Sequence, residues 1–369
     1  MRNLSFVVPN DQCFNLSDEL FQIEPTDLEK IVDMGPVFYR FMSAMQSIVN
    51  IVSNSTLKLS RTWQLVRSYL LIEINPQHKK LIGVHPQRNS LLTRVDFMVD
   101  QNGELKIAEI DPINKHGIGF ALLCRNESGH EERQKILSLL SELFDGYKSL
   151  AIIISERDNF FRLEQEYFAK KLGEYSGKPI HILEERMEER IPQITKRIED
   201  PDCCFLDCPV LGDKDLNQRL LDVFANTPKR FLVPPKHWMG NKAIMAFLYE
   251  PELLMILRAF LNDEDIRMLQ KYIPLTLTTN PKSKGFVVKK VLSSGAKGVF
   301  FGETRPTRNV IYQEYVSQKK FLLENKEQYI RLAAHFVGVK LAELTVTSSS
   351  QVPVHGNSES VNYHVILKS

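Results

Sequence analysis

Apolar residues recur at intervals of three and four positions from Phe38 to about Ile51, the spacing that one face of an α-helix produces. Residues 61–73 repeat this pattern. Earlier in the chain, the segment Ser17–Leu20 has the composition of a helix N-terminus, with a hydroxyl residue followed by acidic ones. Together these patterns predict that residues 1–85 are mostly helical.

Two short segments then alternate between polar and apolar side chains. Residues 94–99 and residues 105–111 both show this alternation, which is typical of half-buried strands. The residues between them include Asn102-Gly103, a strong signal for a tight turn between antiparallel strands. Pro112 is expected to end the second strand, because proline cannot donate a ladder hydrogen bond. The pattern therefore predicts a β-hairpin.

The middle of the chain alternates between helix and strand patterns. A helix is predicted at 131–148, and residues 151–154 form a continuous apolar run, typical of a buried parallel strand. A second helix is predicted at 159–173. Further strands are expected at 179–183, 204–206 and 231–233. Because strands that alternate with helices favour a parallel sheet, residues 150–234 are predicted to form a small α/β domain.

The last third of the chain combines a helical stretch with several strand patterns. Residues 239–271 are predicted to be helical, with an interruption near Pro251. Strands are expected at 285–292, 299–301, 310–316, and as two or three antiparallel strands within 329–347 and 360–367. The fold class is α/β (α+β). Four regions are predicted: a helical N-terminal region (1–85), a segment that contains the hairpin (86–149), the small α/β domain (150–234) and a C-terminal segment (235–369).

Composition and charge exclude several classes of protein. The 47 basic and 45 acidic residues leave a net charge of +2, which provides no overall field for binding nucleic acid or an anionic membrane. No apolar stretch approaches the ~20 residues of a membrane helix, and polar residues interrupt any signal-peptide core. A cytoplasmic protein that binds neither nucleic acid nor membrane is expected. Cys203, Cys204 and Cys208 lack the spacing of a zinc site and are predicted to be buried thiols.

Four charged residues of the predicted hairpin form the first candidate site. Glu109 and Asp111 lie two positions apart on one strand and therefore share a face, where two carboxylates could bind Mg²⁺ together with substrate phosphates. On the other strand, Arg94 and Asp96 also share a face, and the arginine could bind a carboxylate or phosphoryl oxygen. The spacing alone favours a simpler alternative, an exposed hairpin face with ion pairs between its strands.

Two later segments carry lysines that could contact phosphates. Lys289 lies on a predicted strand and is followed by the turn Ser293–Gly298, whose backbone N–H groups could bind an anion. This turn lacks the pattern of a P-loop. Lys242 falls in the first turn of a predicted helix that Asn241 could cap, where an anion would compensate a lysine that opposes the helix dipole. Solvated lysines are the alternative in both segments.

The order of these segments resembles a known enzyme family. Residues 94–98 (Arg-Val-Asp-Phe-Met), 105–113 (Leu-Lys-Ile-Ala-Glu-Ile-Asp-Pro-Ile) and 116–119 (His-Gly-Ile-Gly) are similar to a stretch of eukaryotic glutathione synthetase and of bacterial ligases of the glutathionylspermidine synthase type. The resemblance continues at Gly240–Ile244, at Phe286–Lys290 with its glycine turn, and at Ile311–Val316. In this order the segments are similar to a circularly permuted ATP-grasp ligase, over about residues 91–120 and 235–320.

The resemblance implies a specific reaction. Ligases of this family use ATP to phosphorylate a carboxylate; an amine then attacks the acyl phosphate, and phosphate leaves as the amide bond forms. The implied cofactors are ATP and Mg²⁺. The implied partners are small-molecule carboxylate and amine substrates, or an acceptor on a carrier protein, and related ligases often form homodimers. Specificity is expected in residues 150–234 and in the loop Ser348–Ser358.

The resemblance also implies roles for individual residues. Glu109 and Asp111 would bind the metal, with Asp96 as a further ligand. Arg94 would stabilise the acyl phosphate, while His116 and Gly117 would border the substrate carboxylate. Arg331 is a candidate for a second anion contact. The residues implied to bind ATP, from its phosphates to its adenosine, are Lys242, Lys289, Ser294, Gly295, Lys297, Gly298, Gln313 and Glu314.

The sequence departs from the family pattern at three positions. The glycine turn begins with serine where the family often has a glutamate that binds metal, so Asp96 or Glu303 would have to replace that ligand. Lys290 stands where proline is usual, and Asp111 stands where asparagine is usual and adds a negative charge. The first departure leaves open a second function, a catalytically inactive ATP-grasp module that binds nucleotide or a partner.

Overall fold

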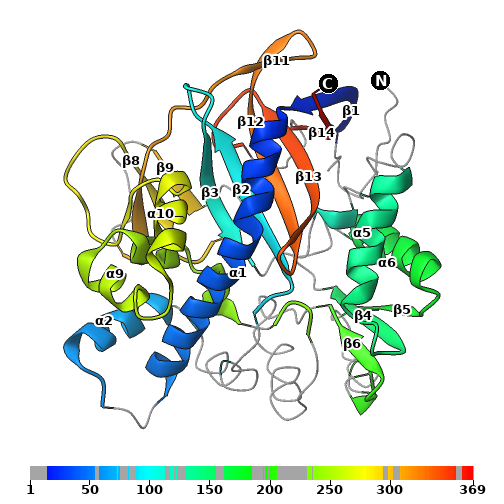
Figure 1. Cartoon of the computed structure of the whole chain (residues 1–369), viewed down its shortest axis with the longest axis horizontal. Helices are drawn as coiled ribbons and strands as arrows, with labels where there is room; N and C mark the ends of the chain where they lie inside the picture. Colours follow the sequence, from blue (N-terminus) through cyan, green and yellow to red (C-terminus); the bar gives the residue numbers. More distant parts are fainter. Residues whose placement is uncertain are drawn as a thin grey trace.

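The computed structural model describes residues 15–54, 58–72, 74, 82, 89–112, 117–119, 122, 130–154, 162–184, 194, 196–197, 199–206, 231–234, 236–293, 298–301, 308–354 and 360–368. Within these residues the chain forms a mixed α/β fold with three β-sheets (Figure 1). The predicted mixed α/β class is confirmed at this level.

The largest sheet combines both ends of the chain with the predicted hairpin. Its strands are β1 (Asn15–Ile23), β2 (Leu92–Val99), β3 (Leu105–Asp111), β11 (Phe321–Leu323), β12 (Lys326–Val337), β13 (Lys340–Ser349) and β14 (Val361–Leu367). They lie in the order β1-β14-β13-β12-β2-β3, with β11 paired to β12. The antiparallel pairing of β2 with β3 confirms the hairpin, and β12, β13 and β14 are antiparallel as predicted.

The predicted helix start at Ser17–Leu20 is wrong, because this segment lies in strand β1. β1 pairs in parallel with β14, so the sheet satisfies its backbone hydrogen bonds. The Ser17 hydroxyl donates to Glu324 Oε1 at 2.6 Å and caps no helix. Phe21 is buried and packs edge to face against Phe321. The partner strand comes from the far end of the chain, which a local pattern does not reveal.

Helix α1 (Pro25–Ser53) crosses one face of the large sheet (Figure 1). It begins well before the predicted stripe, because proline fits the first turn of a helix. Phe38 lies edge to face with Phe97 of β2 and Phe336 of β12, at ring-centroid distances of 6.5 and 5.7 Å. The apolar stripe seen in the sequence is therefore the contact between helix and sheet. Helix α2 (Arg61–Leu70) follows and is capped by Ser60.

The middle of the chain forms a small parallel sheet in the order β5-β4-β6. Its elements are α5 (His130–Glu142), β4 (Ser149–Ile154), α6 (Arg162–Ser176), β5 (Ile180–Glu184) and β6 (Cys203–Phe205). The helix predicted at 131–148 is shorter, because residues 143–146 form turns. The strand expected at 231–233 is reduced to a bridge between Phe231 and Phe205. Cys203 and Cys204 are buried free thiols, as predicted, whereas Cys208 lies outside the described residues.

The third sheet has the order β7-β10-β8-β9. Its strands are β7 (Thr276–Leu277), β8 (Phe286–Lys290), β9 (Val299–Phe300) and β10 (Val310–Glu314). The helical stretch before it consists of the 3₁₀ helices η3 (His237–Gly240) and η4 (Lys242–Leu248), followed by α9 (Pro251–Leu257) and α10 (Asp263–Tyr272). Every residue of η4 is buried, and its apolar residues belong to the same core as α1 and the large sheet. This packing holds the third sheet close to strand β3.

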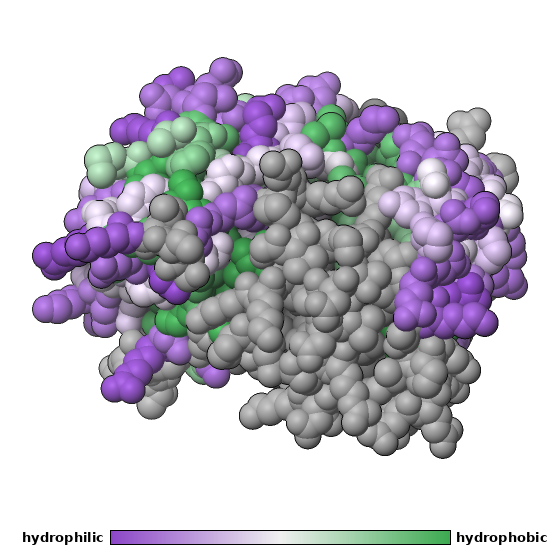
Figure 2. Space-filling model, turned by 90° about the horizontal axis from the view of Figure 1, so that it is seen from below, coloured by the Kyte–Doolittle hydropathy of each residue, from purple (hydrophilic) through white to green (hydrophobic). Residues whose placement is uncertain are grey.

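The surface has the polar character expected from a chain with 25% charged residues. Most of the described surface in the view of Figure 2 is hydrophilic, with smaller hydrophobic areas between. Among the helices that the structure describes, none combines the length and the apolar composition needed to cross a bilayer.

Candidate functional site

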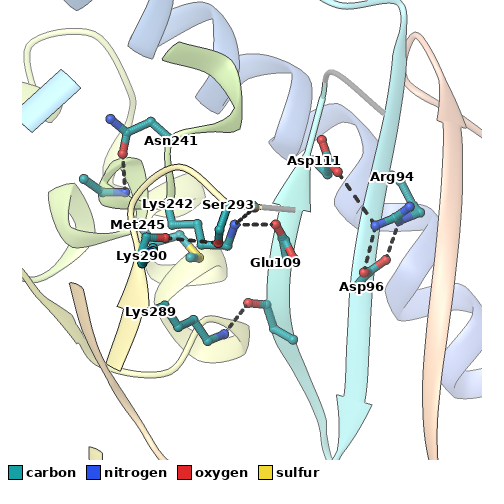
Figure 3. Close-up of polar contacts among 12 residues, drawn as sticks. Arg94, Asp96, Glu109, Asp111, Asn241, Lys242, Met245, Lys289, Lys290 and Ser293 are labelled. Carbon is teal, nitrogen blue, oxygen red and sulfur yellow. Dashed lines mark hydrogen bonds and ion pairs between the residues drawn. The ribbon is translucent and has the colours of Figure 1, made fainter. Parts of the chain in front are cut away.

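A β-bulge in strand β3 aims the carboxylates of the hairpin. Asp96 pairs with Glu109, but the next pair along the ladder is Phe97 with Ile107, so Ala108 is the extra residue on β3. The bulge lets Ile107 and Ile110 both enter the hydrophobic core. Glu109 and Asp111 lie on the opposite face, as the alternation of the sequence predicts, and both are partly accessible. Figure 3 shows this face of the hairpin.

Lys242 connects helix η4 to the hairpin. The Asn241 side chain accepts a hydrogen bond from the backbone N–H of Ala243 at 2.8 Å, which caps η4 as predicted. This cap places Lys242 at the first position of the helix, where its Nζ lies 2.8 Å from Glu109 Oε1. The same Nζ donates to the backbone oxygen of Ser293 at 2.7 Å, at the start of the glycine turn (Figure 3). Three separate segments therefore meet at one amino group.

Lys289 approaches the same part of the hairpin from strand β8. Its Nζ donates to the bulge carbonyl of Ala108 at 2.9 Å and to Gln313 Oε1 at 2.6 Å. Burial lowers the pKa of Lys289 to about 8; Glu109 opposes this shift and Lys242 adds to it. Gln313, expected to bind ATP, is itself buried and accepts the hydrogen bond from Lys289. The structure therefore brings Lys242, Lys289 and Glu109 together across three elements.

A second charged group lies next to them on the same sheet face. Arg94 donates to both carboxylate oxygens of Asp96, at 2.7 and 3.1 Å, and its Nη2 lies 3.7 Å from Asp111 Oδ2. Arg331 Nη1 lies 3.5 Å from Asp96 Oδ2. Burial alone would raise the pKa of Asp96, but Arg94 and Arg331 hold it below its usual value. Asp96 is therefore an ionised carboxylate shared by two arginines.

This arrangement limits which carboxylates fit a metal. The described residues contain no group of three or more histidine, cysteine, aspartate or glutamate side chains that could hold an ion, so Glu109, Asp111 and Asp96 do not form such a group. The Asp96 carboxylate is already paired with Arg94 and Arg331. Glu109 and Asp111 remain partly accessible and fit Mg²⁺ that arrives with phosphates, because such an ion needs only one or two protein carboxylates. Glu303 lies outside the described residues.

His335 of β12 lies beside Arg94, although no pattern in the sequence predicts this position. It faces Arg94 across the β2–β12 ladder and Glu343 across the β12–β13 ladder. Burial lowers the pKa of His335 to about 3, with Arg94 adding to the shift, so the imidazole is neutral. Only the pairing of strands distant in sequence brings it beside Arg94. Arg331 lies on the same strand four residues earlier and donates to Thr347 Oγ1 at 3.3 Å.

The segment around Gly117 packs tightly between His335 and helix α6. Gly117 has a positive φ of 103°, and a Cβ at this position would lie 2.7 Å from His335 Cε1. Its backbone N–H donates to Glu164 Oε1 of α6. His116 lies outside the described residues, as do Ser294, Gly295 and Lys297 of the glycine turn. Gly298, which closes that turn, packs against the side chain of Ser293.

Replacing Gly119 with alanine is expected to destabilise the fold by about 3 kcal/mol, because an added Cβ would overlap the backbone oxygen of Glu164, which cannot rotate away. Urea unfolding measures the loss. Gly146→Ala is the matched control, since an added Cβ there meets no atom within 4 Å. Equal stability of the two variants would contradict the packing described for Gly119.

Glu314 lies at a cleft of about 480 Å³ near the end of β10. The cleft is also lined by Tyr249, Ile273 and Leu275, and by Tyr315, which follows Glu314. Glu314 is exposed, in contrast to the neighbouring Gln313. The cleft is mainly polar, because Asp100, Lys106 and Lys271 also line it.

Comparisons with known proteins add little to this geometry. No protein-family model matches the sequence, and no curated protein matches it. Among solved structures, the chain is similar to a protein described as a "putative gamma-glutamylcysteine synthetase" from Methylobacillus flagellatus KT, with a TM-score of 0.42 and 12% sequence identity. The similarity covers 80% of this chain and 84% of that one. It is too distant to assign a site or an activity.

Proposed function

We propose that this protein is an ATP- and Mg²⁺-dependent carboxylate–amine ligase with a circularly permuted ATP-grasp arrangement. The observation that carries the proposal is the convergence of Lys242 and Lys289, from two different elements, on residues 108 and 109 of the hairpin. Two lysines beside a partly accessible carboxylate are suited to a nucleotide phosphate group. The resemblance to ATP-grasp ligases implies phosphate contacts for the same two lysines and a metal-binding role for Glu109.

The proposed reaction transfers the terminal phosphoryl group of ATP to a substrate carboxylate. Lys242 and Lys289 would neutralise the phosphate oxygens, and Mg²⁺, held by Glu109 and Asp111, would add positive charge for the same oxygens. An amine would then attack the acyl carbon, losing its proton, and phosphate would leave as the amide bond forms. Arg94, fixed by Asp96, would face the charge that develops on the acyl oxygen.

Other predicted residues are proposed to orient the two ends of the substrates. Glu314 and the cleft beside it are proposed to take the adenosine, because the carboxylate can accept hydrogen bonds from ribose and the ring of Tyr249 or Tyr315 can contact the base. Arg331 is proposed to bind a substrate anion. Both arginines lie near Asp96, but Arg94 also lies near Asp111, so the charge of Arg331 is less fully neutralised. Gly117 would border the substrate where His335 supports it.

One observation favours a second function, a nucleotide-binding module without ligase activity. Asp96 is held by two arginines and cannot readily replace the glutamate that the glycine turn lacks. If the remaining carboxylates bind Mg²⁺ too weakly, nucleotide would bind without turnover. A carrier-protein acceptor is a third alternative, and it would make ATP turnover depend on a macromolecular partner.

Mg-ATP at millimolar concentration is expected to raise the melting temperature of the protein, because a ligand at a hundredfold excess over its Kd stabilises the native state by about 2.7 kcal/mol. No shift would contradict both nucleotide-binding functions. ADP release in the presence of amino acids or polyamines then separates them. A ligase should release ADP with one of these substrates, and Glu109→Ala should abolish the release. An inactive module should show the melting shift alone.

A further inference from the structure

The ion pair between Glu109 and Lys242 occupies the groups that a metal and a phosphate would use. Lys242 Nζ lies 2.8 Å from Glu109 Oε1, and its bond to Ser293 uses a second of its three donors. The Lys242 side chain is only 5% exposed, whereas that of Glu109 is 26% exposed. The charge of the buried lysine is therefore neutralised by Glu109 before any ligand binds.

The Glu109 carboxylate also compensates the charge of Lys289. Its hydrogen-bond partners, the Ala108 carbonyl and Gln313, are neutral. Glu109 favours the charged form of Lys289 and Lys242 disfavours it, so one carboxylate compensates two neighbouring ammonium groups. Phosphate oxygens that bind these lysines take over this compensation, and they leave Glu109 without its partner.

A metal-free nucleotide would then place phosphate charge beside an uncompensated carboxylate, which costs energy because like charges repel. A divalent cation that arrives with the phosphates compensates Glu109, so the exchange of partners leaves every charge matched. We infer that Glu109 is a specificity-determining residue, whose charge, left without Lys242 once phosphate binds, selects metal-bound over metal-free nucleotide. This inference rests on the nucleotide site proposed above.

The test is isothermal titration calorimetry of the full chain with a nonhydrolysable ATP analogue, once in EDTA and once in excess Mg²⁺. Work at pH 6.5 keeps Lys289 charged, because its pKa is about 8. Glu109→Gln retains the size of the side chain but removes its charge. The variant is expected to bind the metal-free analogue about tenfold more tightly and the Mg²⁺ form about tenfold more weakly, each change being roughly 1.4 kcal/mol.

Two variants provide comparison. Glu104→Gln changes a carboxylate of the same hairpin that is 65% exposed and pairs with Lys106, and it should leave both dissociation constants unchanged. Lys242→Met removes the other half of the ion pair, so it should weaken both forms and increase the preference for the Mg²⁺ form. A Glu109→Gln protein that binds the metal-free analogue no more tightly than wild type overturns the inference alone. Absence of binding in wild type under both conditions overturns the proposed function as well.

Discussion

Replacing Lys289 with methionine is expected to weaken Mg-ATP binding by about a hundredfold, which corresponds to a loss of roughly 3 kcal/mol of binding free energy. The reason is the burial of this lysine, since its amino group is surrounded by protein and already fixed by Ala108 and Gln313. A charge held in a partly dry, preorganised position interacts with phosphate more strongly than a solvated one. Methionine has a similar length and no charge, so it tests the charge rather than the volume.

The adjacent lysine provides the control for this experiment. Lys290 follows Lys289 on strand β8 but points to the opposite face and is exposed. Lys290→Met should therefore leave the dissociation constant of Mg-ATP within about twofold of wild type, as expected for an exposed charge. Calorimetric titration of both variants gives the comparison. Equal losses in the two variants would mean that general surface charge binds the nucleotide, and the site described here would be wrong.

The same lysine predicts a pH dependence of nucleotide binding. Burial lowers the pKa of Lys289 from 10.5 to about 8, despite the opposing influence of Glu109. Below pH 8 the free protein carries the charge that phosphate requires. Above pH 8 binding must first protonate Lys289, so the affinity should fall towards tenfold for each pH unit. Titrations between pH 6.5 and 9.5 measure this slope, and Lys289→Arg should flatten it because arginine stays charged throughout.

The local part of the site could be predicted from the sequence. The alternating residues of the hairpin and its Asn-Gly turn are local signals, so the sequence was sufficient to place Glu109 and Asp111 on one face. The cap at Asn241 is equally local, and it sets the position of Lys242 in helix η4. The meeting of these two segments was expected only from the order of motifs along the chain.

The remainder of the site depends on pairings that no local pattern contains. Strand β12 brings Arg331 and His335 beside Arg94 and Asp96, and its register is set by contacts between distant parts of the chain. This register explains why Asp96, a reasonable metal ligand by sequence, is shared by two arginines instead. The extra residue Ala108 was equally unforeseen, because a bulge leaves the composition of a strand unchanged.

A second large effect is expected at Lys236, which is buried in the fold. This lysine is only 1% exposed, and its amino group donates to Gln46 Oε1 of helix α1 at 2.5 Å. Burial lowers its pKa to about 7 from the ordinary value of 10.5. The folded protein therefore disfavours the charged form, which the unfolded chain accepts without cost.

The direction of the resulting pH dependence follows from proton binding. Between pH 7 and pH 10.5 the unfolded chain holds a proton on Lys236 that the folded protein has released. The free energy of unfolding must then increase as the pH rises through this window, approaching a tenfold change in the folding equilibrium for each pH unit. Below pH 7 both states hold the proton, and the full cost of burying the charge remains.

Lys236→Met removes both the charge and this dependence. At pH 7 the variant should be more stable than wild type by a few kcal/mol, because it buries no charge. Loss of the hydrogen bond to Gln46 reduces this gain by about 1 kcal/mol. The advantage should shrink as the pH rises towards 10, because wild-type Lys236 is then neutral. Urea unfolding at pH 7, 8 and 9 measures the difference, and Lys284→Met, at an exposed position, corrects for removal of a surface lysine. A difference between wild type and Lys236→Met that stays constant over this range would show that the folded protein keeps Lys236 charged, and the expected pH dependence would then be wrong.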